Sequence, residues 1–385
     1  MESSPIHGTI DAALDSTTDS TIDTTTSFGR FFLPGPTEVH PEVLAAQNQP
    51  LIGHRGPAIK ELMGGLQTGL RDLFRTEAPV LISTSSATGL MEAAVRNGAR
   101  ARVLSLVNGA FSQRFGEIAE ACGFEVETLE VEWGQIITAE QVRERLASGG
   151  FDALTVVHSE TSTGALNPIR EISEAVREQD DVVVLVDSVT GVGGAEVQTD
   201  EWALDFVLTG SQKALALPPG LAFGVASERL MARSATATRK GVYFDLMSFR
   251  KQLDNLQTPT TPAVSLMYAL AKQLDRIRLE GLDARWARHQ AMADRSAQWV
   301  DGMRERGVAL SILAPEGSRS PTVTCVGLPE GTTGPLVVSA MKERGFTIGG
   351  GYGKLKETTF RIGHMGDHSV AELDAVLDAL GEVFP

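Results

Sequence analysis

Residues 151–188, FDALTVVHSETSTGALNPIREISEAVREQDDVVVLVDS, decide the fold class. The runs FDALTVVHS (151–159) and DVVVLVDS (181–188) are short, apolar and rich in valine, as expected for buried strands. Between them, IREISEAVREQ (169–179) reads as a helix. A strand, a helix and a second strand in this order predict a βαβ unit, whose strands are parallel and covered on both faces.

The same alternation extends along the chain on both sides of this unit. Further strand-like runs are APVLIST (78–84), ARVLSLV (101–107), FEVETLEV (124–131) and LDFVLTGS (204–211), and helix-like patterns separate most of them. We therefore predict an α/β fold with a mainly parallel sheet. The right-handed crossover rule brings the C-terminal ends of parallel strands to one edge, where open α/β sheets bind ligands.

Length and a change of pattern divide the chain into parts. A chain of 385 residues exceeds what one hydrophobic core usually supports, so two domains are expected. After the proline-rich loop NLQTPTTP (255–262), a long helical pattern leads into short strands and helices that predict a smaller α+β domain. We expect a disordered acidic tail at 1–27, a large domain at 28–279 and a small C-terminal domain at 280–385.

Charge and cysteine usage exclude several classes of function. The net charge is −15 and no basic stripe stands out, which argues against nucleic acid and anionic membranes as partners. No apolar run approaches the roughly 20 residues that span a bilayer. Cys122 and Cys325 lie far apart and the seven histidines are scattered, so neither a disulfide framework nor a metal site is expected.

Residues 1–27 carry no Lys or Arg, which argues against a targeting peptide, and we expect a cytoplasmic location. The glycines of GVGG (191–194) lack the GxGxxG spacing of a dinucleotide site, and no P-loop motif occurs.

One lysine stands out in the stretch VLTGSQKALALPPG (207–220). Lys213 is the only lysine between Lys60 and Lys240, and arginine supplies the other basic side chains of that interval. A lysine amine loses its proton when it is partly buried, whereas a guanidinium does not. Chemistry that needs a neutral amine, such as covalent bonding to a carbonyl group, therefore requires lysine. The alternative is an isolated lysine in a chain that prefers arginine.

Polar residues follow four of the predicted strands. Their positions are Ser86, Ser162, Asp187 and Lys213. The sheet would bring them together along its C-terminal edge. Asp187 ends a run of apolar residues and is costly to bury without a cationic partner. It could instead cap the following turn, DSVTG (187–191).

Six motifs occur in the order in which they occur in one known family. They are PGPT (34–37), STSSATGLMEA (83–93), HSETSTG (158–164), LVDSV (185–189), GSQKAL (210–215) and FRIG (360–363). Together they resemble the class V aminotransferases of pyridoxal 5′-phosphate (PLP) fold type I, specifically the alanine–glyoxylate and serine–glyoxylate (serine–pyruvate) group. The resemblance runs from about Phe31 to the C-terminus. It implies a mainly parallel sheet of the seven-stranded type in the large domain.

The resemblance also implies a PLP site. Lys213 would bond covalently to the cofactor, and Asp187 would pair with the ring nitrogen and keep it protonated. Phe111, in VNGAFSQR (107–114), stands where the family places an aromatic ring, commonly tryptophan, over the cofactor. The other implied contacts are Ser86, Ala87 and Thr88 at a helix N-terminus and Gln212, all on the phosphate, and Ser162 near the phenolic oxygen. Ala87 stands where the family often has glycine.

Substrate binding and a site shared between the subunits of a homodimer follow from the same resemblance. Arg361 matches the arginine that clamps the substrate α-carboxylate in a bidentate pair. Thr260 matches a hydroxyl that the neighbouring subunit lends to the phosphate, and Gln257 stands where the family often has a tyrosine. His54 and Arg55 fall where the N-terminal segment approaches the partner's site, although they could instead pin their own loop.

The implied activity is PLP-dependent transamination in two alternating half-reactions, from alanine or serine to glyoxylate or pyruvate. Aspartate, phosphoserine and ureidoglycine stay open as donors, because His54 and Arg55 could bind a side-chain anion. A cysteine desulfurase, or another PLP-dependent lyase, is the alternative on this fold. A desulfurase needs a nucleophilic cysteine on a mobile loop, whereas Cys325 lies in a strand-like run and Cys122 in a helical pattern.

Overall fold

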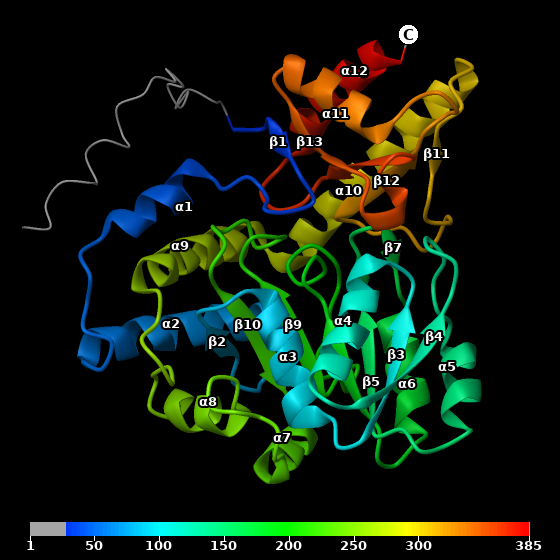
Figure 1. Ribbon diagram of the computed structural model, residues 1–385. Coiled ribbons are helices and arrows are strands. Elements are labelled where there is room, and N and C mark those ends of the chain that lie inside the picture. The colour runs from blue at the N-terminus through cyan, green and yellow to red at the C-terminus, as the bar shows by residue number, and fades with distance from the viewer. Residues whose placement is uncertain (1–27, 385) are drawn as a thin grey trace, which may run out of the picture.

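A seven-stranded sheet forms the centre of the large domain in the computed structural model, which describes residues 28–384 (Figure 1). The strand order is β2-β10-β9-β8-β5-β3-β4, and all pairs are parallel except the two that β10 makes. The predicted mainly parallel α/β sheet is therefore confirmed. The acidic tail predicted at 1–27 lies outside the described residues. The strands are β2 Leu81–Ser83, β3 Arg102–Val107, β4 Glu125–Glu130, β5 Ala153–Val157, β8 Val183–Asp187, β9 Phe206–Gly210 and β10 Ala222–Ala226, with the short hairpin β6 Ser159–Glu160 and β7 Ala165–Leu166 beside them.

Helices connect these strands and pack on the sheet. Contacts join α3 to β8, β9 and β10, and α4 to β3, β4 and β5. Local signals set their ends: α5 starts at a capping box in which Thr138 and Gln141 satisfy each other's backbone N–H groups. The helices of the large domain are α1 Pro41–Ala45, α2 Pro57–Phe74, α3 Ala87–Gly98, α4 Ala110–Ala121, α5 Ala139–Leu146, α6 Ile169–Arg177, α7 Glu228–Thr236, α8 Leu246–Leu253 and α9 Val264–Glu280, with the short 3₁₀ helix η2 Ala46–Asn48.

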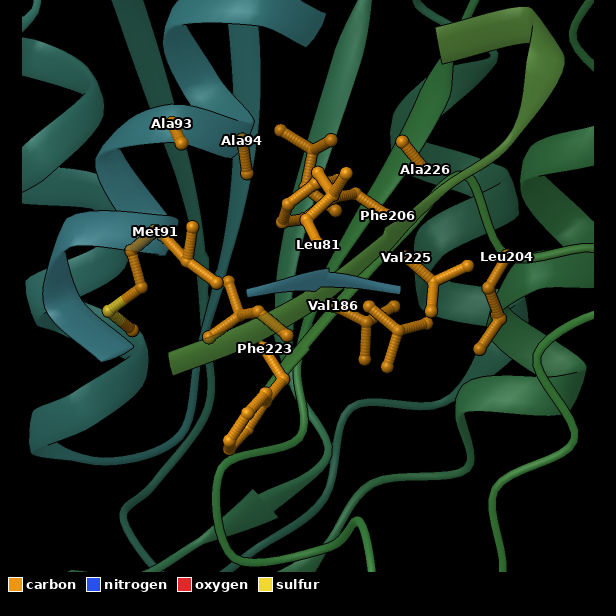
Figure 2. Close-up of a cluster of buried hydrophobic side chains, with 14 of the residues drawn as sticks. Leu81, Met91, Ala93, Ala94, Val186, Leu204, Phe206, Phe223, Val225 and Ala226 are labelled. Atoms are coloured by element: carbon orange, nitrogen blue, oxygen red, sulfur yellow. The ribbon is translucent and has the colours of Figure 1, made fainter. Parts of the chain in front are cut away.

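The central strands lie entirely inside the protein. Every residue of β5, β8, β9 and β10 is buried, which explains why these segments read as unbroken apolar runs and not as alternating patterns. Figure 2 shows part of this core, where Phe206 of β9 and Phe223 of β10 lie on opposite faces of the sheet, because Phe206 pairs with Ala226 and Phe223 with Thr209. Burying one large apolar side chain contributes about 1.5–3 kcal/mol, so this layer supplies much of the stability of the large domain.

A second, five-stranded sheet belongs to the small domain, in the order β1-β13-β14-β12-β11. Its own hydrophobic core includes Phe32 of β1 together with residues of the C-terminal helices. The N-terminal segment is expected from the sequence to belong wholly to the large domain, but its strand β1 pairs in parallel with β13 and so completes the small sheet. The predicted boundary between 279 and 280 lies beside Gly281, where α9 ends and α10 begins. The elements are β1 Phe31–Phe32, α10 Leu282–Glu305, β11 Ser311–Ile312, β12 Val323–Gly327, α11 Gly334–Glu343, β13 Thr347–Gly350, η3 Gly353–Leu355, β14 Thr359–Gly363 and α12 Val370–Val383.

The small sheet stands over the C-terminal edge of the large one (Figure 1). Arg361, on β14, donates a hydrogen bond of 3.1 Å to the carbonyl of Thr161, which directly follows β6. Residues of both sheets therefore meet at the edge where the sequence analysis expects a site. Between residues 28 and 384, no helix combines the length and the apolar character needed to cross a membrane.

Phe206→Ala tests the core of the large domain. Phe206 is fully buried, and its ring lies so close to β10 that a Cβ on Gly224 would come within 2.9 Å of it. We expect the substitution to lower the free energy of unfolding by about 3–5 kcal/mol, measured by guanidinium unfolding followed by circular dichroism. Leu336→Ala, on the exposed face of α11, is the matched control and should change it by less than about 0.5 kcal/mol. Equal losses in the two variants would contradict the assignment of Phe206 to the stabilising core.

Candidate active site

Lys213 lies just after β9, at the C-terminal edge of the large sheet, and its side chain is partly buried. Its ammonium group donates a hydrogen bond to the carbonyl of Pro34, so the N-terminal segment reaches this edge. A Cβ on Gly35 would come within 2.3 Å of Nζ, so only glycine leaves room for the lysine. Burial, and then the positive charge of Arg361, lower the pKa of the amine to about 8. The amine is therefore more readily neutral than an exposed lysine, as covalent bonding to a carbonyl group requires.

Asp187 is the last residue of β8 and is 4% exposed. Its Oδ1 accepts a hydrogen bond of 2.8 Å from the N–H of Val189, which is the turn cap that the sequence allows. Within residues 28–384 the carboxylate has no other hydrogen-bond donor. Burial raises its pKa to about 7, the nearby Glu160 adds to this effect, and Lys213 opposes it. A buried carboxylate that accepts a single hydrogen bond from the described chain is suited to a cationic partner such as a protonated ring nitrogen.

The start of α3 provides free backbone donors. Ser86 is the N-cap residue, and its side chain makes no capping hydrogen bond. The amides of Ala87 and Thr88 have no acceptor in the described part of the chain. Gln212 comes to the same place, because a Cβ on Gly210 would lie 2.8 Å from Gln212 Oε1 and 3.2 Å from the Cβ of Ala87. Free N–H groups at the positive end of a helix dipole are suited to a phosphate group.

Glu160 organises the neighbouring strand end, and no pattern in the sequence points to this residue. The side chain is fully buried and accepts hydrogen bonds from the backbone N–H groups of Phe111, Ser112 and Ser162 at 3.3, 2.8 and 3.1 Å. It also accepts from the hydroxyls of Ser112 and Ser162. Ser162 Oγ in turn accepts from the N–H of Ala110 at 3.0 Å. One carboxylate therefore fixes both the first turn of α4, which carries Phe111, and the loop that carries Ser162.

Arg361 and Phe111 complete the surroundings of the lysine. The centroid of the Phe111 ring lies 5.9 Å from Lys213 Nζ. The guanidinium of Arg361 donates to the carbonyls of Gly350 and Thr161, at 2.8 and 3.1 Å. No carboxylate among the described residues forms an ion pair with Arg361. A largely buried cation without an anion is suited to a carboxylate ligand.

Tyr352 and Arg114 also lie at the site, and the sequence gives no sign of their pairing. Arg114 Nη2 donates a hydrogen bond of 2.9 Å to the Tyr352 hydroxyl, across 238 residues of sequence. The Tyr352 ring lies 5.2 Å from the Phe111 ring, and the Arg361 guanidinium lies 5.5 Å from its centroid. The small domain thus contributes both Arg361 and an aromatic side chain to the site.

The residues expected to act across a dimer interface form a separate cluster. Arg55 donates hydrogen bonds to the backbone carbonyls of Thr258 and Pro259 and to the side chain of Gln257. This is the loop-pinning role that the sequence left open. Thr260 is exposed at the end of the same loop, and His54 is half-buried next to Arg55. Within the described chain, the hydrogen bonds of this cluster do not reach the other site residues.

Comparison with known proteins agrees with this geometry. The profile of the family Aminotransferase class-V matches residues 36–353. The chain belongs to the class V aminotransferase family. It is 38% identical to an uncharacterized aminotransferase of Methanocaldococcus jannaschii over 90% of each chain. Among solved structures it is similar to an aspartate aminotransferase from Thermus thermophilus, with 35% identity, a TM-score of 0.83 and coverage of 92% of this chain and 99% of the other. It is also similar to an alanine–glyoxylate aminotransferase from Nostoc sp., with 31% identity, a TM-score of 0.86 and coverage of 96% and 100%.

This class V aminotransferase is a PLP-dependent transferase, and the residues at the sheet edge fit the cofactor. The free amides of α3 are suited to its phosphate, the buried Asp187 to its protonated ring nitrogen, and the amine of Lys213 to its aldehyde. Across residues 28–384, no group of three or more His, Cys, Asp or Glu side chains is arranged to hold a metal ion.

Asp187→Asn should stabilise the cofactor-free enzyme increasingly as pH rises. Unfolded Asp187 ionises near its ordinary pKa of 3.8, whereas the folded protein holds the proton until about pH 7. Raising the pH between these values therefore favours the unfolded wild type, and asparagine has no such penalty. Between pH 5 and 8 we expect the stability difference to grow by on the order of 3 kcal/mol, measured by urea unfolding. Asp301→Asn, at an exposed position on α10, is the control, and a flat difference for Asp187→Asn would contradict the assignment.

Proposed function

We propose that this aminotransferase transfers the amino group of a small amino acid, alanine or serine, to a small 2-oxo acid, glyoxylate or pyruvate. The observation that carries the proposal is that the positive charge of Arg361 acts on the amine of Lys213. A cation without a carboxylate partner lies close enough to a readily neutral amine to lower its pKa. An amino acid offers a carboxylate to Arg361 while it presents its α-carbon to Lys213.

We propose the following roles for the residues at the edge of the sheet. Lys213 attaches the cofactor, Asp187 holds its ring nitrogen in the protonated form, and Phe111 covers its ring. Ser86, Ala87, Thr88 and Gln212 bind the phosphate, and Ser162 lies beside the phenolic oxygen. The free amides of α3, the burial of Asp187 and the contacts of Glu160 support these roles.

The protein's own groups then position the substrate and move its proton. When bound, PLP withdraws electrons from the substrate α-carbon. Arg361 holds the substrate carboxylate, which fixes the orientation of the α-carbon. Lys213, released by the incoming amino group, takes the α-proton as a neutral amine, because a pKa near 8 leaves part of it unprotonated at neutral pH. The same lysine returns a proton to the substrate carbon in the opposite half-reaction, when a 2-oxo acid is converted into an amino acid.

The position of Tyr352 supports a small donor. Its ring lies against both Phe111 and Arg361, and its hydroxyl is held by Arg114. An aromatic ring fixed at both ends occupies space next to the carboxylate clamp that a long substrate side chain would otherwise use. Alanine and serine, with one or two heavy atoms beyond the α-carbon, are the donors that need the least of this space.

Aspartate is the second candidate donor, and Arg114 is the observation that favours it. Among the described residues, the guanidinium of Arg114 has the Tyr352 hydroxyl as its hydrogen-bond partner and no carboxylate in ion-pair distance. A second unpaired guanidinium near Arg361 could hold the side-chain carboxylate of a dicarboxylic acid. The similarity to an aspartate aminotransferase of known structure is consistent with this candidate.

The desulfurase alternative receives little support from either cysteine. Cys325 is buried in β12, and burial raises the pKa of its thiol to about 11. Cys122 lies at the end of α4, and burial raises the pKa of its thiol as well. A thiol held protonated at neutral pH is a poor nucleophile.

The absorption spectrum of the purified enzyme tests the proposed function. We expect a visible band from the lysine-bound cofactor that decays when L-alanine or L-serine is added alone and returns when glyoxylate is added. Lys213→Arg keeps the charge but cannot form the covalent bond, so it should lack this band. A band that responds to L-aspartate and not to alanine or serine would replace the proposed donor by the second candidate. A wild type without the band after incubation with PLP would contradict the role of Lys213.

We further propose that the enzyme is a homodimer whose partner subunit completes each site. A groove of about 820 Å³ lies between η2, α2 and α9, close to the Arg55 cluster. Leu44 and Leu51, near this groove, are 46% and 77% exposed. Exposed leucines beside a groove with an apolar lining favour a protein surface as its partner. A second copy of the chain is the partner that would also bring His54, Arg55 and Thr260 to a neighbouring site.

Subunit complementation tests the shared site. Lys213→Ala and Arg55→Ala should each be nearly inactive as homodimers, because one lacks the attaching lysine and the other the residue that holds the loop before Thr260. A mixed dimer keeps one complete site if Arg55 serves the partner. When the two variants are co-expressed with different affinity tags and pair at random, about half of the dimers are mixed, and each mixed dimer has one complete site of two. The whole population should therefore regain about a quarter of wild-type activity. Failure of the mixed dimer to regain activity would show that Arg55 serves its own subunit.

We propose a cytoplasmic location for the enzyme. Cys122 and Cys325 are both free thiols, on different domains. A reducing compartment suits a protein with unpaired cysteines. The net charge of −15 argues against nucleic acid as a partner.

A further inference from the structure

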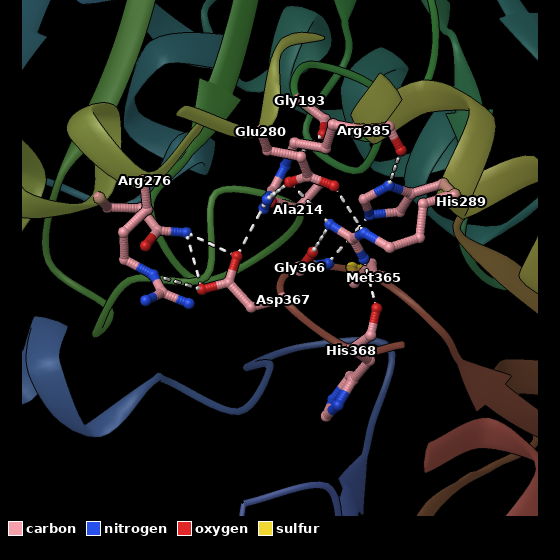
Figure 3. Close-up of polar contacts among 12 residues, drawn as sticks. Gly193, Ala214, Arg276, Glu280, Arg285, His289, Met365, Gly366, Asp367 and His368 are labelled. Atoms are coloured by element: carbon pink, nitrogen blue, oxygen red, sulfur yellow. Dashed lines mark hydrogen bonds and ion pairs between the residues drawn. The ribbon is translucent and has the colours of Figure 1, made fainter. Parts of the chain in front are cut away.

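Arg285 is a buried cation that none of the proposed catalytic roles uses. It lies in the first turns of α10, at the junction of the two domains, and is 1% exposed. Its Nε donates to the carbonyl of Gly193 at 3.0 Å, and its Nη2 donates to the carbonyl of Ala214 at 2.9 Å. Its Nη1 contacts the carboxylates of Glu280 and Asp367, each at 2.9 Å (Figure 3). The guanidinium therefore links backbone of the large domain to an acidic residue of the small one.

One of these contacts reaches the loop of the attaching lysine. Ala214 directly follows Lys213, so its carbonyl lies in the loop of the lysine, in the peptide that joins Ala214 to Leu215. On the other side, the carbonyl of Gln212 accepts a hydrogen bond of 2.9 Å from the N–H of Thr37. Ala216, two residues after Ala214, has a φ of +50°. Alanine adopts this left-handed conformation at a cost of order 1 kcal/mol, so the surrounding structure must maintain it. Contacts from other elements therefore hold this loop.

The other contact reaches the loop that follows Arg361. Asp367 lies four residues after the end of β14, the strand that carries Arg361. Thr37, which holds the Gln212 carbonyl, also donates through its hydroxyl to the carbonyl of Met365 at 3.1 Å. A Cβ on Gly366 would come within 2.9 Å of the Cβ of Ala216, so the two loops are packed directly on each other.

Arg288 provides a natural comparison within the same network. It lies one turn further along α10, contacts Glu280, and donates to the carbonyls of Gly366 and His368. Arg288 therefore binds the small-domain loop and the end of α9, as Arg285 does. It makes no hydrogen bond to Ala214 or to any other residue of the loop of Lys213. A role in joining the domains is common to both arginines, and a role in placing the lysine is specific to Arg285.

We propose that Arg285 is a positioning residue that sets the place of Lys213 relative to the carboxylate clamp Arg361. It acts through the Ala214 carbonyl on one side and through Asp367 on the other. The proposal rests on the proposed roles of Lys213 and Arg361. The planar guanidinium is required because it donates in three directions at once, whereas a lysine ammonium on a flexible stem does not reproduce that geometry.

The test compares Arg285→Lys with Arg288→Lys, two variants that keep the charge. Both should lower the thermal midpoint, since both weaken the junction. Only Arg285→Lys should shift the pH titration of the visible band of the lysine-bound cofactor, by roughly half a pH unit or more. It should also lower kcat for the amino donor by about tenfold or more, with KM changed less than about threefold, because a small misplacement of reacting groups slows the reaction more than it weakens binding. Equal band titrations in Arg285→Lys and wild type, or equal shifts in both variants, would overturn the proposal.

A second measurement separates this proposal from the proposed function. In the cofactor-free protein, hydrogen–deuterium exchange of peptides covering 211–217 should be faster in Arg285→Lys than in Arg288→Lys. This readout does not require a correct assignment of the substrate, or any turnover. If Arg285→Lys does not fold, Asp367→Asn removes the charge that anchors Nη1 and should produce the same faster exchange. Unchanged exchange at 211–217 in the folded variant would overturn the proposal even if the wild type transaminates alanine.

Discussion

The burial of Asp187 at the end of β8 is the constraint on which the site depends. The strand lies between β5 and β9, and every residue of these three strands is buried, so the carboxylate has no route to solvent through them. Burial raises the pKa of an acid in this position to about 7, and a positive charge beside it favours the ionised form. Parallel pairing with β9 brings the loop of Lys213 to the same edge. The positions of α3 and α4, which begin at this edge, follow from the same strand order.

Much of this arrangement could be predicted from the sequence, but residues whose roles depend on contacts between distant segments could not. Fully buried strands leave unbroken apolar runs, so the polar residues that end them, such as Asp187 and Lys213, are conspicuous. Glu160 is not conspicuous, because a glutamate among serines and threonines reads as solvent-exposed until α4 presents its free amides to it. The pairing of Tyr352 with Arg114 depends on how the two domains meet, which no local pattern encodes.

In the proposed function, recognition of a substrate is divided between the two sheets. Lys213 follows a strand of the large sheet and Arg361 lies on a strand of the small one, so an amino acid bound by both would contact both domains. Its binding energy therefore also favours the arrangement in which the two domains are correctly placed. Asp187 also caps its own turn, and Arg55 also holds its own loop, so each has a local structural role besides the role proposed for it at the site.

Because β1 pairs with β13, the small sheet can form only late in the synthesis of the chain on the ribosome. Phe31 is among the first described residues to be synthesised, but its strand partner, Thr347, emerges roughly 300 residues later. The large domain can collapse while translation continues, since its core ends near Ile277. The small sheet cannot close until translation is almost finished. Until then the first strand presents an unpaired edge, and the nascent chain has to keep it from pairing with other molecules.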